Sequence, residues 1–396
     1  MPLPRSLRPR APRMRRSLLP PGCDQRRGCV GVHPPTRPGR GAMSGDMVDG
    51  PVVDGTPGDG PRGAEGTLEV ERLSVRFQVD NSWIGRIRGR SGEITAVDDV
   101  SFTLQRGASL GIVGESGCGK STMARAVVGL VKPDSGDIRY GGVRLGAKRS
   151  RRQRRLIQMV FQDPGSSLNP SMTPRRVLSE LLRVHDMVPA GDIGDRCEEL
   201  LDLVELPRRL IDARPRHLSG GQRQRIGIAR ALALEPEVLI ADESVAALDV
   251  SVQASVLNLL ADLRRRLGLM LLFVSHDLAV IRHVSDEVIV MYLGGIVEHS
   301  PAAQLFDVPR HPYTKALLAS APRLKQPTAA EPPIVGEPLS VLSVPAGCRF
   351  EPRCPVAFDR CRTQRPGLID TGGGSAACWL IEEPRKGRKM SKPWDT

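Results

Sequence analysis

The most constraining stretch of this 396-residue chain is a glycine-rich loop between an apolar run and a helical run. It matches the phosphate-binding pattern Gly-x4-Gly-Lys-Ser/Thr at every fixed position, from Gly114 to Ser121. The apolar run 110–113 predicts a buried strand and 123–128 predicts a helix, which is the context that such a loop requires. Glycines let the backbone turn tightly, and amides at a helix start favour an anion. The stretch therefore predicts a phosphate-binding α/β domain.

The residues of this loop have separate expected roles. We expect Lys120 to contact the β- and γ-phosphates of a nucleotide and Ser121 to ligate Mg²⁺. The remaining loop residues would contact the phosphates mainly through backbone amides. They are Gly114, Glu115, Ser116, Gly117, Cys118, Gly119 and Thr122.

Charge is unevenly distributed along the chain. The formal net charge is +13, but ten arginines and one acid, Asp24, give residues 1–42 a charge of +9 and leave +4 for the rest. A body this close to neutral gives little support for nucleic-acid binding. No stretch approaches the roughly 18–20 apolar residues of a membrane-spanning helix, so other subunits would supply any span.

Residues 1–66 are rich in proline, arginine and glycine and show no periodicity, so we expect them to be disordered. They lack the apolar segment of a secretory signal. Three origins of this leader stay open. It is a translated artefact upstream of a true start at Met43 or Met47, a transit peptide, or an arm that binds anionic lipid.

Downstream, strand patterns alternate with helical patterns. Strands are expected at 68–77, 95–104, 136–140, 156–161, 237–241, 269–274 and 287–291, the first resembling an edge strand. Helices are expected at 177–184, 195–204, 221–233 and 252–267. This alternation predicts a mostly parallel sheet covered by helices. We expect an α/β domain over 67–308 with a helical lobe at about 168–234, then an irregular, proline-rich extension over 309–396.

Two acids follow the apolar strand 237–241. Ligands of parallel α/β sheets bind at the carboxyl ends of the strands, so this is where the phosphate loop would also lie. Asp242 is therefore placed to hold Mg²⁺, and Glu243 is placed to orient or deprotonate an attacking water. The alternative is that both are ordinary surface acids.

A second anion-binding turn is predicted at the start of the helix 221–233. Its residues are Ser219, Gly220, Gly221 and Gln222. One nucleotide does not easily use two such turns of one chain. The simplest resolution is a dimer in which this turn closes over the nucleotide of the other copy, and the alternative is a capped helix with no further role.

Three further side chains are candidates. Gln162 ends a strand and would contact Mg²⁺ or the attacking water, and His276 ends another and would donate to the γ-phosphate. Phe77 would stack on the base. A lone histidine at a strand end is more often structural, and Phe77 is equally well explained as a core residue.

Together these elements resemble the ATP-binding subunits of ABC transporters over about 68–300. The matching motifs occur in the order of that family, at 114–122, Gln162, 218–222, 238–243, 247–249 with Asp249, and His276. The resemblance implies the ABC ATPase fold with an antiparallel β edge, ATP and Mg²⁺ as ligands, and ATP hydrolysis. It makes Glu243, His276 and Gln162 catalytic, and it adds Asp249 to the contacts across the dimer.

Finer features are similar to the oligopeptide/dipeptide/nickel import branch. They lie at 113–119, 161–170, 249–253 and 311–314, and in the cysteine-containing tail. That resemblance implies a peripheral protein at the cytoplasmic face of the membrane. Its expected partners are a second, related ATPase in a heterodimer, two transmembrane permease subunits and, indirectly, a substrate-binding protein, with no nucleic acid.

One motif departs from the family pattern Asp-Glu-Pro-x-Ser-Ala-Leu-Asp. Ser244 replaces the proline and Ala246 replaces the serine. The first change frees a backbone φ angle and the second removes a hydroxyl. Because both acids are intact, we expect altered coupling between two nucleotide sites and retained hydrolysis.

The tail carries four cysteines separated by five, six and sixteen residues, namely Cys348, Cys354, Cys361 and Cys378. Stable disulfides are not expected in a cytosolic protein, and four thiols in a core-poor segment suggest a metal staple. Some members of the family look able to carry a [4Fe–4S] cluster here. Zinc and free thiols remain alternatives.

The predicted function is ATP hydrolysis that drives import of oligopeptides, dipeptides or a similar small solute. One alternative is a soluble ABC-type ATPase acting on ribosomes or DNA, which the single nucleotide domain and modest body charge disfavour. Another is a nucleotide-gated adaptor that barely hydrolyses ATP, which the intact Glu243 disfavours.

Overall fold

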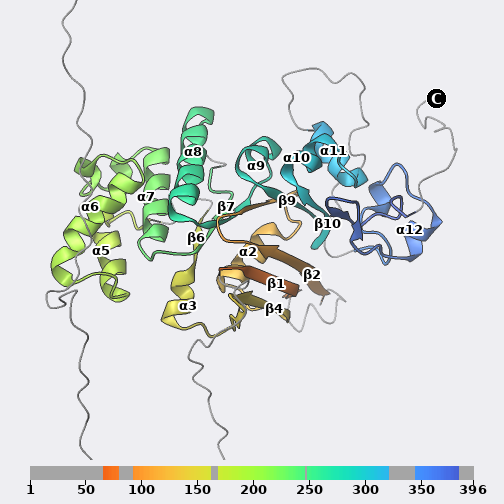
Figure 1. Ribbon diagram of the computed structural model, residues 1–396, viewed down its shortest axis with the longest axis horizontal. Helices are drawn as coiled ribbons and strands as arrows, with labels where there is room; N and C mark the ends of the chain where they lie inside the picture. The colour runs from red at the N-terminus through yellow and green to blue at the C-terminus, as the bar shows by residue number, and fades with distance from the viewer. Residues whose placement is uncertain (1–65, 80–91, 162–167, 246–247, 321–343, 383–396) are drawn as a thin grey trace, which may run out of the picture. The chain divides into compact units, whose positions relative to one another are not determined.

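The computed structural model describes residues 66–79, 92–161, 168–245, 248–320 and 344–382 (Figure 1). Its main sheet has eight strands in the order β11-β12-β10-β9-β3-β8-β7-β6. Strands β9, β3, β8, β7 and β6 are parallel to one another, whereas β10 pairs antiparallel with β9 and with β12, and β12 pairs antiparallel with β11. The bounds are β3 Ser109–Val113, β6 Ile157–Val160, β7 Val238–Asp242, β8 Met270–Val274, β9 Glu287–Tyr292, β10 Gly295–Pro301, β11 Ile369–Asp370 and β12 Ser375–Ala376.

A second, antiparallel sheet has the order β2-β1-β4-β5. Its strands are β1 Leu68–Val79, β2 Gly92–Leu104, β4 Ser135–Tyr140 and β5 Val143–Arg144. The expectation of an edge strand at 68–77 is wrong, because β1 pairs with β2 on one side and with β4 on the other. Its alternation is imperfect because the register shifts near Arg72, which has a positive φ of 49°.

The parallel strands are buried on both faces and separate two hydrophobic cores. Side chains of a strand alternate between the faces. Leu239 and Ala241 of β7 enter the core shared with the helices that follow β6, whereas Val238 and Ile240 enter the core shared with β1 and β2. The apolar run of β7 thus serves two cores, which explains why it is continuous rather than alternating.

Helices cover both faces of the main sheet. They are α2 Lys120–Val128, α8 Val250–Leu267, α9 Leu278–Val284 and α10 Ala302–Asp307. The predicted apolar face of α8 is confirmed by its buried residues Val256, Leu259, Leu260 and Leu263. The α/β fold expected from the sequence is therefore the observed one.

Between β6 and β7 the chain is helical. Figure 1 shows α5, α6 and α7 grouped together, and α7 contacts β6. Cys197 is fully buried there, as expected of a core residue. The elements are α5 Pro174–Val184, η1 Ala190–Asp192, α6 Ile193–Leu203, η2 Arg208–Leu210, η3 Pro215–His217 and α7 Gly220–Leu232; the short helix α3 Arg151–Leu156 precedes β6.

The C-terminal extension is more regular than the sequence suggested. Residues 312–320 form a helix that begins at a proline, a position where the missing N–H is not needed. Strand β12 pairs with β10, so the extension completes the main sheet. Its elements are α11 Pro312–Ser320, η4 Glu351–Arg353, α12 Asp359–Thr363, β11 and β12.

A buried carboxylate anchors the start of this extension. Glu298 of β10 is 0% exposed, and its two oxygens accept the backbone N–H groups of Arg310 and His311 at 2.8 and 2.9 Å. These bonds satisfy donors that would otherwise be buried without partners.

We expect Glu298→Ala to lower the free energy of unfolding by about 3 kcal/mol, because the buried N–H of His311 and the part-buried N–H of Arg310 lose their acceptor. Urea unfolding of the full chain measures this. Glu287→Ala is the matched control on β9, since the Glu287 side chain is half exposed and pairs with His299 at 2.9 Å, and it should cost less than about 1 kcal/mol. Equal losses in both variants would contradict the role of Glu298.

Candidate functional site

The predicted phosphate loop connects β3 to α2. Gly114, Gly117 and Gly119 have φ values of 153°, 80° and 106°, which favour glycine. A Cβ at Gly119 would lie 2.1 Å from the carbonyl oxygen of Ala96, so no larger residue fits there. Gly119 also starts α2 without a side-chain cap. The first amides of α2 are therefore left for an anion rather than for the protein itself.

Lys120 is folded back over this loop. It is only 4% exposed, and its Nζ donates to the carbonyl oxygens of Gly114 and Glu115 at 2.8 and 2.9 Å. The ammonium is thus held at the mouth of the loop. Cys118 Sγ lies 3.8 Å from the same nitrogen, and burial raises the pKa of this thiol. A neutral, buried sulfur agrees with a packing role for Cys118.

The two predicted Mg²⁺ ligands meet. Ser121 Oγ, in the first turn of α2, donates to Oδ1 of Asp242, the last residue of β7, at 2.8 Å. Asp242 is buried at the end of β7, and this burial raises the pKa of its carboxyl group. A hydroxyl and a carboxylate are the oxygen ligands that Mg²⁺ prefers, so these residues fit that ion.

The two catalytic candidates beside them also meet. Glu243 has a positive φ of 44°, and its N–H donates to the carbonyl oxygen of Val274 at the end of β8 at 2.9 Å. This turn brings Glu243 Oε1 to 3.4 Å from His276 Nδ1. A carboxylate and an imidazole at the carboxyl ends of β7 and β8 are suited to handling a proton.

The second predicted turn is a capping box. Ser219 Oγ accepts the N–H of Gln222 at 3.2 Å, and the Gln222 side chain accepts the N–H of Ser219 at 2.9 Å. A Cβ at Gly221 would lie 2.4 Å from Val252 of α8, so the glycine permits close packing. Asp249 precedes α8 and makes no side-chain cap. Among the described residues, no hydrogen bond joins 219–222 to 114–122 of the same chain.

Of the remaining predicted residues, some are described by the structure and others lie outside the described residues. Phe77 is 44% exposed on β1, so the core alternative for it is wrong and an exposed aromatic remains. Gln162 lies outside the described residues, as do Ala246, most of the leader 1–66 and part of the 247–249 motif. Ser244, which stands in place of the family proline, is buried, and its hydroxyl has no hydrogen-bond partner among the described residues.

Sequence reasoning missed two residues that contact the phosphate loop from the extension. The N–H of Glu115 donates to the hydroxyl of Tyr313 at 2.9 Å, and Arg353 pairs with the Glu115 carboxylate at 2.9 and 3.1 Å. Tyr313 and Arg353 lie 198 and 238 positions downstream of Glu115. The motif at 311–314 was noticed only as a family feature, and nothing in its spacing points to the loop.

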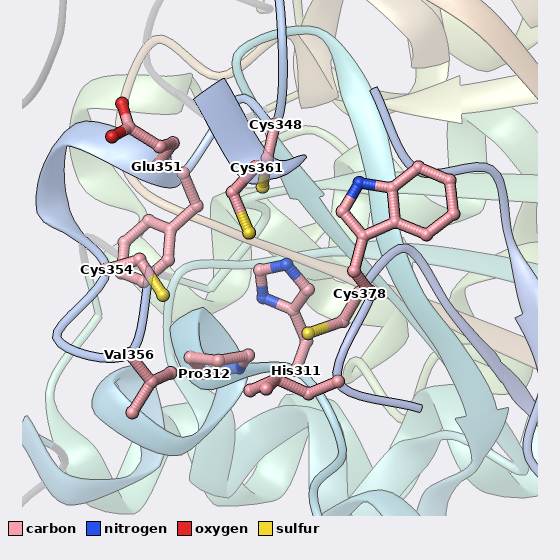
Figure 2. Close-up of a pocket in the computed structure, with 11 residues that line it drawn as sticks. His311, Pro312, Cys348, Glu351, Cys354, Val356, Cys361 and Cys378 are labelled. Atoms are coloured by element: carbon pink, nitrogen blue, oxygen red, sulfur yellow. The ribbon is translucent and has the colours of Figure 1, made fainter. Parts of the chain in front are cut away.

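The four tail cysteines line one pocket together with His311 (Figure 2). None of them forms a disulfide. Burial raises the pKa of the Cys348, Cys354 and Cys378 thiols, to about 12 for Cys354 and about 11 for Cys378, and the neighbouring thiols add to the effect. Burial also lowers the pKa of His311 to about 3. Without a cation, this pocket favours neutral thiols and a neutral imidazole.

The pocket as it stands is tight, with a volume of about 10 Å³. Across the described ranges, no three His, Cys, Asp or Glu side chains come close enough to share one metal ion. The thiols would have to move outwards to admit any larger group.

Comparison with known proteins identifies the family. Residues 97–246 match the ABC transporter family, and residues 297–361 match the C-terminal region of oligopeptide/dipeptide transporters. The oligopeptide transport ATP-binding protein AppF of Bacillus subtilis is 48% identical over 309 residues, which cover 76% of this chain and 93% of that protein. The chain belongs to the ABC transporter ATP-binding subunits of the oligopeptide/dipeptide family.

Further similar proteins are also ATP-binding components of the ABC type. A protein of Sinorhizobium fredii described as a "probable peptide ABC transporter ATP-binding protein" is 44% identical over 83% of this chain and 93% of its own length. Among solved structures, a post-hydrolysis dimer of an ATP-binding cassette bound to ADP and Pi is 27% identical, with a TM-score of 0.52 over 59% of this chain and 98% of that one. CbiO1 of Clostridium perfringens is 28% identical, with a TM-score of 0.52 over 61% of this chain and 90% of its own.

The ABC ATPase fold and ATPase class are thereby shown for this chain. In the part of the chain that the structure describes, no helix is both long and apolar enough to cross a membrane.

Two capping boxes in this ABC ATPase allow a matched test of the second turn. Ser150 caps α3 with the same geometry, 3.2 Å to the Gln153 N–H and 3.0 Å back. Ser150→Ala and Ser219→Ala should each cost about 1 kcal/mol of unfolding free energy. Only Ser219→Ala should also slow ATP turnover, because only that hydroxyl would face a nucleotide. Equal turnover in the two variants would leave Ser219 with a capping role alone.

Proposed function

We propose that this chain is the ATP-hydrolysing subunit that drives import of oligopeptides, dipeptides or a similar small solute across a membrane. The observation that carries the proposal is the joint match of an ABC ATPase domain and a peptide-transporter C-terminal region in one chain. The names of the relatives from B. subtilis and S. fredii support peptide as the solute. A role on ribosomes or DNA has no such support.

In the proposed reaction the residues already brought together bind the triphosphate. Lys120 exchanges its two carbonyl acceptors for β- and γ-phosphate oxygens, and the free amides of α2 contact the same anion. Ser121 and Asp242 would hold Mg²⁺, which neutralises charge developing on the phosphates. Exposed Phe77 would stack on the adenine ring.

Glu243 is the proposed acceptor of the proton of the attacking water. His276, 3.4 Å away, would hold the Glu243 carboxylate in place and donate to the γ-phosphate. Gln162, which follows β6, is proposed to contact Mg²⁺ or the water and to report nucleotide binding to the helical block 168–234.

We infer that hydrolysis takes place in a dimer, with Ser219, Gly220, Gly221, Gln222 and Asp249 of one copy completing the site of the other. The structural neighbour that is dimeric and holds ADP and Pi supports this. By the same family reasoning, the second subunit of this dimer is a related but distinct ATPase rather than a second copy of this chain. Two permease subunits would provide the membrane path and a binding protein would deliver the solute, which places this subunit at the cytoplasmic face.

We also propose that Cys348, Cys354, Cys361 and Cys378 hold a [4Fe–4S] cluster. Four thiols around one pocket, three of them buried and that of Cys354 half-buried, form a donor set of the kind that holds such a cluster, and the positive charge of its irons would favour the thiolate form. The thiols would have to move to bind either a cluster or zinc, because no three metal-binding side chains of the described residues lie within reach of one ion. Zinc and free thiols are therefore the alternative outcomes of the test. The cluster would serve structure rather than the hydrolytic step.

The ATPase proposal is tested by Glu243→Gln in the purified transporter. We expect phosphate release to fall at least about 100-fold with ATP binding retained, because the proton acceptor is lost. Glu235→Gln is the matched control, since Glu235 also has a positive φ, 50°, but it precedes β7, whereas Glu243 follows the other end of that strand. Wild-type turnover no faster than that of Glu243→Gln would favour the nucleotide-gated adaptor.

The cluster proposal is tested on the full chain purified without oxygen. We expect absorbance at about 400 nm with about four iron and four sulfide per chain. Cys361→Ser should remove most of it, whereas Cys197→Ser, which changes a buried thiol outside the pocket, should not. A colourless protein with one zinc, or with no metal, would reject the cluster.

A further inference from the structure

The phosphate loop contains an acidic residue that is neutralised from the extension. Glu115 follows Gly114 directly and so lies within the loop that is proposed to bind the triphosphate. Arg353 binds that carboxylate with two hydrogen bonds, Nη1 to Oε2 at 2.9 Å and Nη2 to Oε1 at 3.1 Å. The side chains of Arg353 and Glu115 are only 6% and 21% exposed. This is a largely desolvated, bidentate ion pair, unlike an ordinary surface pair.

Arg353 is itself held firmly. Its Nη1 also donates to the Tyr292 hydroxyl at 3.2 Å, and Tyr292, Tyr313 and Phe350 pack against one another with ring centroids 4.5 to 5.4 Å apart. The Tyr313 hydroxyl accepts the Glu115 N–H at 2.9 Å. One aromatic cluster therefore supports both the guanidinium and the backbone of the loop.

The turn that carries Arg353 belongs to the cysteine pocket. Arg353 ends η4, which lies between Cys348 and Cys354, and Phe350 lines the pocket. The N–H of Cys354 donates to the Glu351 carbonyl at 3.1 Å, so the thiol and the guanidinium are carried by the same short turn.

We infer that Arg353 is a positioning residue for nucleotide binding: by cancelling the charge of Glu115, it lets the loop accept a triphosphate. The inference rests on the proposed function of this loop. Its physical basis is Coulomb repulsion. Two like charges held close together near a protein surface, where the effective dielectric constant is about 20, repel strongly enough to weaken binding about tenfold. The extension thereby sets the affinity of the ATPase domain for nucleotide.

The competing explanation is that the pair only docks the extension. Arg365 offers a comparison, since it pairs with Asp98 of β2 at 3.1 Å and also joins the extension to the ATPase domain. It has no bond to the loop among the described residues. If the pair only docks the extension, Arg353 should affect nucleotide binding no differently from Arg365, whereas charge cancellation predicts an effect of Arg353 that depends on the charge of Glu115.

The test is titration of the full-length chain with a fluorescent ADP analogue. We expect Arg353→Met to raise Kd about tenfold, and the loss should shrink between about 0.05 M and about 0.5 M salt because the repulsion is screened. Glu115→Gln should bind at least as well as wild type. The double variant Glu115→Gln/Arg353→Met should return to within about threefold of wild type. Arg365→Met should leave Kd unchanged.

Each result decides one question. A double variant as weak as Arg353→Met, or a Kd in Arg353→Met equal to wild type, would overturn charge cancellation. Equal losses in Arg353→Met and Arg365→Met would show docking alone. Wild-type protein that binds neither the ADP analogue nor ATP would instead reject the proposed function of the loop, and the variants would then show no differences in nucleotide binding.

Discussion

The uncapped start of α2 is the feature on which the rest of this structure depends. Gly119 leaves the first helical amides without a side-chain acceptor, and the loop before it is shaped by three glycines with positive φ. An arrangement of unsatisfied donors is stable only next to water or an anion. The parallel register of β3, β8 and β7 then brings Asp242, Glu243 and His276 to the same edge of the sheet.

The extension is an integral part of this ATPase domain. Strand β12 continues the main sheet, buried Glu298 fixes the start of the extension, and Arg353 and Tyr313 contact the phosphate loop. The cysteine pocket and the phosphate loop thus share one packed aromatic cluster. A displacement of side chains on one side of such a cluster shifts those on the other side, because packed interiors have little free volume.

Local patterns predicted much of the fold. The helix 252–267 was found by its apolar face, and β7 and β8 by short apolar runs, since burial of these segments follows from their own composition. The position of β1 between β2 and β4 could not be predicted in this way, because distant segments decide which strands lie next to it. The helix 312–320 is not predicted from the sequence, because a proline-rich segment favours irregular chain. A proline nevertheless suits the first position of a helix, which is where Pro312 lies.

The sequence by itself determined which residues are the candidates for the nucleotide site, because a phosphate loop, two acids after an apolar strand and a histidine after another are short motifs that local spacing encodes. Only the tertiary structure decided that Glu115 is neutralised, since its partner Arg353 lies 238 positions away and meets it through folding alone. The gathering of four thiols around His311 was decided in the same way. Contacts between distant segments depend on the packing of the whole sheet, and no local spacing encodes them.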